Sequence, residues 1–354
     1  MKRKLLSVLL STSLVATILT GCGGSGGSAA STGNGELNIF VWTEYVPESV
    51  IDKFEEETGI KVNMSTYSSN EDMLSKVKSE TAGAYDIVQP SDYMVAQMIA
   101  QDMLAELDFD KLPNFSNIGE SYKNPSYDPG NVHSVPYLGG AGAIAVNTAK
   151  IDMEIDSYDD LFDPQLAGQL VVLDDFRAVI GMTSKSMGYS LNESDPVVLA
   201  EVSDKLMQLK NNVVLYDSDS PKSALIAGDC NAGMIWSAEV AMAMEENPDI
   251  KVVYPSEGAY LFFDSWCVTK EAPNYDNAMT FINFMMEPEN MKLVLEEFPY
   301  MCANTKAIEL MGEEYSNNPA KNPPADAISK GEYVQNLDSD VLDIYSEMWT
   351  KLKE

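Results

Sequence analysis

The feature that most constrains this chain is a regular alternation of strand-like and helix-like segments that begins at residue 36. Predicted strands cover residues 37–42, 61–67 and 85–89, and predicted helices cover 47–59, 69–78 and 93–101. Pro47 and Gly59 mark the two ends of the first helix, and Ser69 with Asp72 forms a capping box at the start of the second. This β-α-β-α-β order predicts a parallel sheet covered by helices on both faces.

The alternation restarts after the run Gly139-Gly140-Ala141-Gly142, which its composition predicts to be a turn. Predicted strands then cover 143–147, 169–173, 213–216, 234–236, 250–254 and 260–268, and predicted helices cover 179–187, 197–210, 222–227, 238–246, 275–286, 289–298 and 337–353. About 320 residues follow the N-terminal region, enough for two domains. The simplest architecture is two α/β lobes with a crevice between them.

The N-terminus has the pattern of an exported lipoprotein. Residues 1–21 begin with three basic side chains, continue with an apolar stretch too short and too polar to span a membrane, and are predicted to be a signal peptide. Leu-Thr-Gly-Cys at 19–22 resembles a lipobox, which predicts lipidation of Cys22; a plain secretory signal is the alternative. Residues 22–35 are mostly Gly, Ser, Ala, Thr and Asn, and are predicted to be a flexible tether. We therefore expect an extracytoplasmic protein that is attached to the membrane only through its lipid.

The chain is strongly acidic, and this excludes some partners. Its formal charge of -32 becomes -35 when residues 1–21 are removed. Nucleic acids and anionic lipid surfaces are therefore not expected to bind, whereas small cations would be attracted. The other three cysteines, Cys230, Cys267 and Cys302, lack CxxC spacing and accompanying histidines, so no zinc site is expected. A Cys267–Cys302 disulfide and buried free thiols both remain open.

Aromatic and acidic side chains recur at the ends of the predicted strands. Ligands of open α/β sheets bind beyond the carboxyl ends of strands. The residues at or just after these ends, with an acid inside the aromatic segment 260–266, are Trp42, Glu44, Tyr45, Ser91, Asp92, Tyr93, Asp174, Asp175, Asp217, Asp219, Trp236, Glu239 and Asp264. Singly, each of them could be a core residue or a helix cap. Together they predict a site for an organic cation, since carboxylates and aromatic faces both attract one.

Catalytic arrangements find little support in the sequence. His133 is the one histidine, so a Ser-His-Asp or Cys-His site would depend on it alone, and no Gly-x-Ser-x-Gly, Walker or HExxH motif occurs. The stretch from Asp217 to Asp219 begins like a calcium loop but continues into Pro221 and Lys222. We expect neither a metal nor a cofactor, and no catalytic residue is assigned. A secreted glycosidase stays open, because it needs only a carboxylate pair and aromatic platforms.

Several segments resemble the spermidine/putrescine-binding proteins of ABC importers. The first is Trp-Thr-Glu-Tyr-Val-Pro at 42–47; the others are at 57–62, 65–67, 69–71, 83–86, 112–117, 131–137, 233–236 and 330–333. The resemblance extends from about residue 37 to the C-terminus. It implies an α/β, two-lobed periplasmic-binding-protein-like fold of class II, in which each lobe is a mostly parallel sheet flanked by helices. The implied lobes are residues 36–140 with 265–310, and residues 141–264 with 311–354.

The resemblance also implies a set of ligand-binding residues in the cleft between the lobes. These are Trp42, Thr43, Glu44, Tyr45, Ser91, Tyr93, Asp175, Trp236, Phe262, Asp264, Tyr300 and Gln335. Two positions depart from the spermidine-type pattern: Ala178 replaces a Glu, and Phe262 replaces a Trp. Putrescine, spermidine and a related amine therefore all stay open as ligands.

We thus expect a monomeric, non-catalytic receptor that presents a polyamine to a membrane permease. Its lobes are expected to close about two chain crossings, near residues 138–142 and 262–266. A binding protein for another small solute is the alternative, ahead of the glycosidase.

Overall fold

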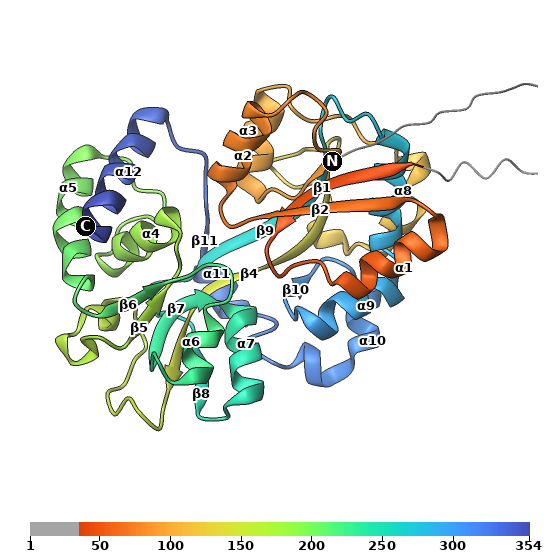
Figure 1. The fold of residues 1–354 in the computed structure, drawn as a ribbon. Coiled ribbons are helices and arrows are strands. Elements are labelled where there is room, and N and C mark those ends of the chain that lie inside the picture. Colours follow the sequence, from red (N-terminus) through yellow and green to blue (C-terminus); the bar gives the residue numbers. More distant parts are fainter. Residues whose placement is uncertain (1–34) are drawn as a thin grey trace, which may run out of the picture. The chain divides into compact units, whose positions relative to one another are not determined.

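The central element of the structure is one mixed β-sheet. The structure is a computed structural model that describes residues 35–354. Its strands are β1 (Glu36–Trp42), β2 (Lys61–Tyr67), β3 (Ile87–Val88), β4 (Ser134–Asn147), β5 (Leu170–Val172), β6 (Val213–Tyr216), β7 (Ala232–Trp236), β8 (Ile250–Val253), β9 (Tyr260–Val268), β10 (Met301–Cys302) and β11 (Glu332–Tyr333). The main path of the sheet runs β2-β1-β3-β9-β4-β7-β5-β6 (Figure 1). The predicted signal peptide, Cys22 and nearly all of the predicted tether lie outside the described residues.

Both ends of this sheet are parallel, as the alternation of segments predicts. At one end β1 pairs in parallel with β2 and β3, and at the other β5 pairs in parallel with β6 and β7. Between them β9 runs antiparallel to β3 and β4, and β4 runs antiparallel to β7. The long strands β4 and β9 therefore connect the two parallel groups. The predicted lobe boundaries stay a prediction.

The predicted turn at Gly139–Gly142 is wrong, because these glycines lie inside β4. This strand is unbroken for 14 residues and is buried along its length. A Cβ atom on Gly139 would lie 2.7 Å from the carbonyl oxygen of Phe262 and 2.4 Å from the Phe263 ring. The glycines therefore do not form a bend. They allow β4 to approach β9 closely, because they carry no side chain.

The helices cover the sheet and agree closely with the predicted ranges. They are α1 (Glu48–Thr58), α2 (Asn70–Ser79), α3 (Asp92–Ala100), α4 (Phe176–Ser186), α5 (Pro196–Leu209), α6 (Lys222–Ala227), α7 (Ser237–Glu246), α8 (Tyr275–Met285), α9 (Pro288–Glu297), α10 (Thr305–Ser316), α11 (Ala325–Lys330) and α12 (Ser339–Lys353). α4, α5 and α12 pack together at the β6 end of the sheet, while α1, α8 and α9 pack near β1 (Figure 1). The prediction missed α10 and α11.

Helix ends show why these segments fold locally. The Ser69 hydroxyl accepts a hydrogen bond from the Asp72 amide at 3.1 Å, which confirms the predicted cap of α2. Gly59 ends α1 with a left-handed φ of 71°, a conformation that glycine adopts without steric cost.

The core is aromatic and aliphatic, and the cysteines belong to it. Among the described residues, Cys230, Cys267 and Cys302 are buried free thiols, so the Cys267–Cys302 disulfide is not formed. Trp266, Tyr137 and Tyr158 are among the largest fully buried side chains. From residue 35 onward, every helix is too short or too polar to traverse a bilayer.

Candidate functional site

Most of the predicted ligand-binding residues surround one narrow cavity of about 40 Å³. Its lining consists of Trp42, Thr43, Tyr45, Tyr67, Ser68, Asn70, Ser91, Asp175, Ser218, Asp219, Trp236, Tyr260, Phe262, Asp264 and Tyr300. These side chains come from the ends of β1, β2 and β7, the starts of α2, α3 and α4, the loop after β6, β9, and the residue before β10. The cavity therefore lies where the strand-end rule places a ligand.

Asp264 is the most deeply buried carboxylate of the cavity. It lies in β9 with only 2% of its surface exposed. The Ser91 hydroxyl donates a hydrogen bond to Oδ1 at 2.6 Å, and the Tyr45 hydroxyl donates to Oδ2 at 2.7 Å. Burial raises the pKa of Asp264 to about 7, although the bonds from Ser91 and Tyr45 lower it. In the absence of a cation this buried group is therefore poised between its neutral and charged forms.

The Trp42 indole supports the same carboxylate. Its buried N–H finds no hydrogen-bond partner of normal geometry among residues 35–354. It nevertheless lies close enough to Asp264 to lower the pKa of that carboxyl. Ser91 and Tyr45 thus remain the two donors that hold the carboxylate, and burial outweighs them in setting its pKa.

Aromatic rings enclose the rest of the cavity. Tyr45 and Tyr300 meet edge to face with ring centroids 4.9 Å apart, and Trp236 meets Phe262 in the same way at 5.0 Å. Trp42 packs on Tyr67 at 4.5 Å. Burial raises the pKa of both Tyr45 and Tyr300, so these phenols stay neutral at physiological pH. Rings arranged in this way can hold both methylene groups and a cation.

Asp175 supplies a second, half-buried carboxylate. It is the N-cap of α4, and its Oδ1 accepts a hydrogen bond from the Ala178 amide at 3.0 Å. Burial raises its pKa, while that bond and the nearby Arg177 lower it. Asp175 thus has a structural task in the helix and also an oxygen available at the cavity.

Tyr93 and Gln335 lie elsewhere, along a neighbouring cavity. The Tyr93 hydroxyl donates to Glu71 at 2.9 Å, and the Arg177 guanidinium lies over the Tyr93 ring at 5.2 Å. Arg177 also donates to the Gln335 carbonyl at 2.8 Å. The structure therefore places Tyr93 and Gln335 around a buried arginine, and their role as ligand contacts stays a prediction.

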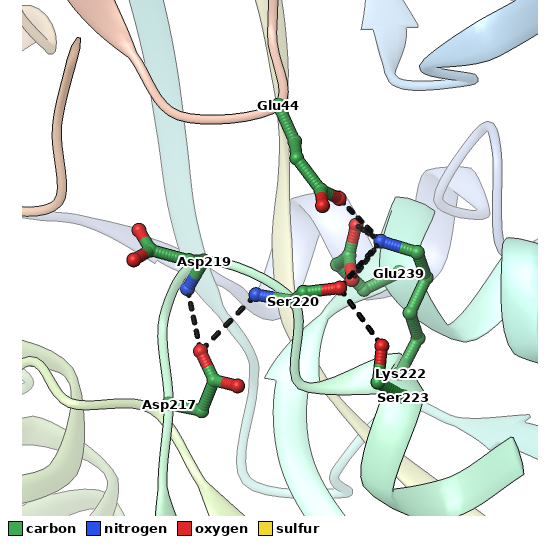
Figure 2. A network of polar contacts seen from close by, with 7 residues as sticks. All are labelled: Glu44, Asp217, Asp219, Ser220, Lys222, Ser223 and Glu239. Carbon is green, nitrogen blue, oxygen red and sulfur yellow. Dashed lines mark hydrogen bonds and ion pairs between the residues drawn. The ribbon is translucent and has the colours of Figure 1, made fainter. Parts of the chain in front are cut away.

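Glu44 stands beside the cavity and faces a lysine of the protein itself. Its backbone has a left-handed φ of 51°, which is uncommon for a residue other than glycine. Its carboxylate pairs with Lys222, which also contacts Glu239 (Figure 2). The predicted role of Glu44 as a ligand contact therefore stays a prediction, because its carboxylate is already paired with Lys222.

Six lining residues, Tyr67, Ser68, Asn70, Ser218, Asp219 and Tyr260, were absent from the predicted ligand set. Tyr67 is the last residue of β2, so the strand-end rule could have selected it, and the same rule had already indicated Asp219 in the loop after β6. Tyr260 shares one face of β9 with Phe262 and Asp264, as the two-residue period of a strand requires. No sequence pattern indicated Asn70. It lines the cavity because its side-chain amide forms hydrogen bonds with Ser91.

Known proteins resemble this chain over most of its length. A family model for bacterial extracellular solute-binding proteins matches residues 49–324. The spermidine/putrescine-binding periplasmic protein of Salmonella typhimurium is 39% identical over 327 residues, which cover 92% of this chain and 94% of that protein.

Solved structures extend the comparison. A spermidine/putrescine ABC transporter substrate-binding protein from Streptococcus pneumoniae matches with a TM-score of 0.75 and 34% identity, covering 90% of this chain and 99% of that one. A lipoprotein of Treponema pallidum matches with a TM-score of 0.78 and 28% identity, covering 90% and 99%. The predicted fold class and the predicted resemblance are confirmed by these matches.

Proposed function

Because the chain belongs to the family of bacterial extracellular solute-binding proteins, we propose that it is the binding component of an ABC importer for a short polyamine such as putrescine or spermidine. The observation that carries this proposal is Asp264, a buried carboxylate that is held by Ser91 and Tyr45 inside an aromatic cavity. An ammonium group would pair with Asp264 and compensate its desolvation.

The remaining lining suits the rest of such a ligand. Asp175 offers a second carboxylate, and Trp236, Phe262 and Tyr300 offer apolar faces for methylene groups. Members of this family are solute-binding transport proteins, and we propose that this chain likewise has no catalytic role.

The cavity residues come from both parallel groups of the sheet, which supports ligand capture by closure. Trp42 and Tyr67 end strands of one group, and Trp236 ends a strand of the other. The Ser68 hydroxyl also donates to Asp219 at 2.6 Å across the cavity mouth. We propose that the lobes hinge near residues 138–142 of β4 and 262–266 of β9.

We further propose that the protein is exported, processed before Cys22 and lipidated there, and that it delivers its ligand as a monomer to a membrane permease. The lipobox-like sequence and the similarity to a lipoprotein of Treponema pallidum support this anchor. In cells that express the protein, Cys22→Ser should abolish incorporation of labelled fatty acid and release the protein from the membrane fraction. Unchanged labelling would contradict the assignment.

A ligand screen tests the proposed function directly. Thermal shift and calorimetry with putrescine, cadaverine, spermidine, spermine, amino acids and sugars should show binding only with the amines. Asp264→Ala should weaken amine binding by at least about 2 kcal/mol, because a buried charge pair is lost. Asp128→Ala is the matched control, since Asp128 is equally buried but bonds to Ser134 and the His133 amide. Binding of a sugar or amino acid alone, or turnover of an oligosaccharide, would overturn the proposal.

A further inference from the structure

The Lys222 side chain carries an ammonium group whose hydrogen-bond donors are all used by neighbouring side chains. Its Nζ contacts Glu44, lies 3.0 Å from Glu239 Oε2, and lies 3.0 Å from the Ser220 hydroxyl oxygen (Figure 2). A lysine ammonium has three N–H donors, and these three partners can use all of them. Only 16% of the Lys222 side chain is exposed, and only 1% of the Glu239 side chain.

The charges of this triad depend on one another. Burial raises the pKa of Glu239 to about 7, although Lys222 lowers it. Burial also opposes the charged form of Lys222, but Glu239 and Glu44 outweigh it and raise the pKa of the lysine. Lys222 thus keeps two carboxylates paired that would otherwise lack a cation.

The triad adjoins the candidate cavity. Glu44 lies between the lining residues Thr43 and Tyr45, and Lys222 follows the lining residue Asp219 by three positions. After burial, the carboxylates Glu239, Asp264 and Glu44 also raise the pKa of Tyr300, which lines the cavity. Lys222 therefore stands where a ligand ammonium paired with Glu44 would otherwise stand.

We propose that Lys222 determines specificity by acting as a built-in ammonium that occupies Glu44, so that the cavity prefers a diamine to a triamine. The inference rests on the proposed function and deepens it. With Glu44 and Glu239 paired internally, the buried Asp264 and the half-buried Asp175 remain as the least exposed carboxylates of the lining. Ala178, next to the Asp175 cap, adds no further charge. Two ammonium groups match Asp264 and Asp175. A third would meet only Asp219, which is exposed to solvent and already accepts the Ser68 hydroxyl.

Calorimetry on four variants tests the inference, with putrescine and spermidine as probes. The wild type should prefer putrescine. Lys222→Met should shift the ratio of the two affinities toward spermidine by at least about tenfold, since it frees Glu44 for a third ammonium. Adding Glu44→Gln to Lys222→Met should remove this gain. Lys321→Met is the matched control: Lys321 is 15% exposed and pairs with Glu245 at 2.7 Å, and neither residue lines the cavity.

Glu44→Gln alone gives a second readout that does not depend on the stability of Lys222→Met. Glu239 still pairs with Lys222 in this variant, so the affinity for putrescine should change by less than about threefold. A tenfold loss in Glu44→Gln, or a Lys222→Met protein with the preference of the wild type, would overturn the inference and leave the proposed function standing. A wild-type protein that binds no amine would instead overturn the proposed function.

Discussion

Asp264 makes ligand binding depend on pH at the scale of a single residue. Its pKa is raised to about 7 in the free protein, mainly by burial. An ammonium ligand binds the ionised form, so below about pH 7 binding must expel a proton. We expect the affinity for an amine to be constant well above pH 7 and to fall by up to about tenfold per pH unit below it. Calorimetry between pH 5 and pH 9, in two buffers of different ionisation enthalpy, measures both the affinity and the proton release.

Glu239 also has a pKa in this range, so its contribution to the pH dependence needs a control. The pKa of Glu239 is also raised to about 7, mainly by burial. Glu239→Gln should keep the pH dependence, whereas Asp264→Asn should bind weakly at every pH. An affinity that is the same at pH 5.5 and pH 8 would show that Asp264 does not pair with the ligand.

The sequence identified most lining residues but not their charge partners. Trp236 was predicted because rings at strand ends converge in an α/β sheet, and Asp264 because an acid inside the aromatic segment 260–266 is costly to bury without a partner. Glu44 carried the same signal, yet it pairs with Lys222, which is 178 positions away in the chain. Tyr93 similarly receives Arg177 on its ring. Long side chains find such partners only in the tertiary fold, so strand positions alone cannot reveal them.

At the scale of one helix, Asp175 combines a cap with a predicted ligand contact, and these two tasks can be separated. Asn caps helices as well as Asp does, so Asp175→Asn should leave the free energy of unfolding nearly unchanged while it weakens amine binding at least about tenfold. Asp175→Ala should lose both, at a stability cost of about 1 kcal/mol. Chemical denaturation and calorimetry on the two variants measure this. Equal amine affinity in the wild type and Asp175→Asn would remove Asp175 from the site.

The contact between β4 and β9 gives a second prediction for an element. Gly139→Ala would place a methyl group against the Phe262 carbonyl, and should destabilise the protein by about 1–3 kcal/mol. In Gly140→Ala the nearest atoms are the tip of the Phe262 ring and the Ser237 hydroxyl oxygen, both at 3.1 Å. These are side-chain atoms that can move, so the cost should be smaller. Urea denaturation compares the two. A Gly139→Ala protein as stable as the wild type would contradict the close approach.

Helices α6 and α10 and the glycines of β4 show which elements local sequence patterns can predict. Helix α6 was predicted with the bounds that the structure has, since a helical stretch there ends at Gly228 with a left-handed φ of 78°. Helix α10 was missed because Gly312 interrupts its pattern, with a φ of 79° inside the helix. The glycines of β4 misled the prediction for a different reason. Glycine signals both turns and close packing of strands, and only the position of β9 decides between them.

At the scale of the whole molecule, the net charge of -32 should govern how fast a cationic ligand arrives. A field of this sign attracts a diamine over several ångströms, and added salt screens it. Stopped-flow fluorescence can follow binding through Trp42 and Trp236, which both line the cavity. We expect the association rate constant for putrescine to fall several-fold between 10 mM and 300 mM salt, while the dissociation rate constant changes much less.

The charge of the ligand supplies the control for this effect. A monoamine carries half the charge of putrescine, so its association rate should depend less steeply on salt. The same acidic surface serves solubility whether or not it steers ligands, and only the rate constants distinguish these two roles. If the association rate is insensitive to salt, attraction by the whole molecule is negligible, and the cation preference must arise inside the cavity, where Asp264 is screened least.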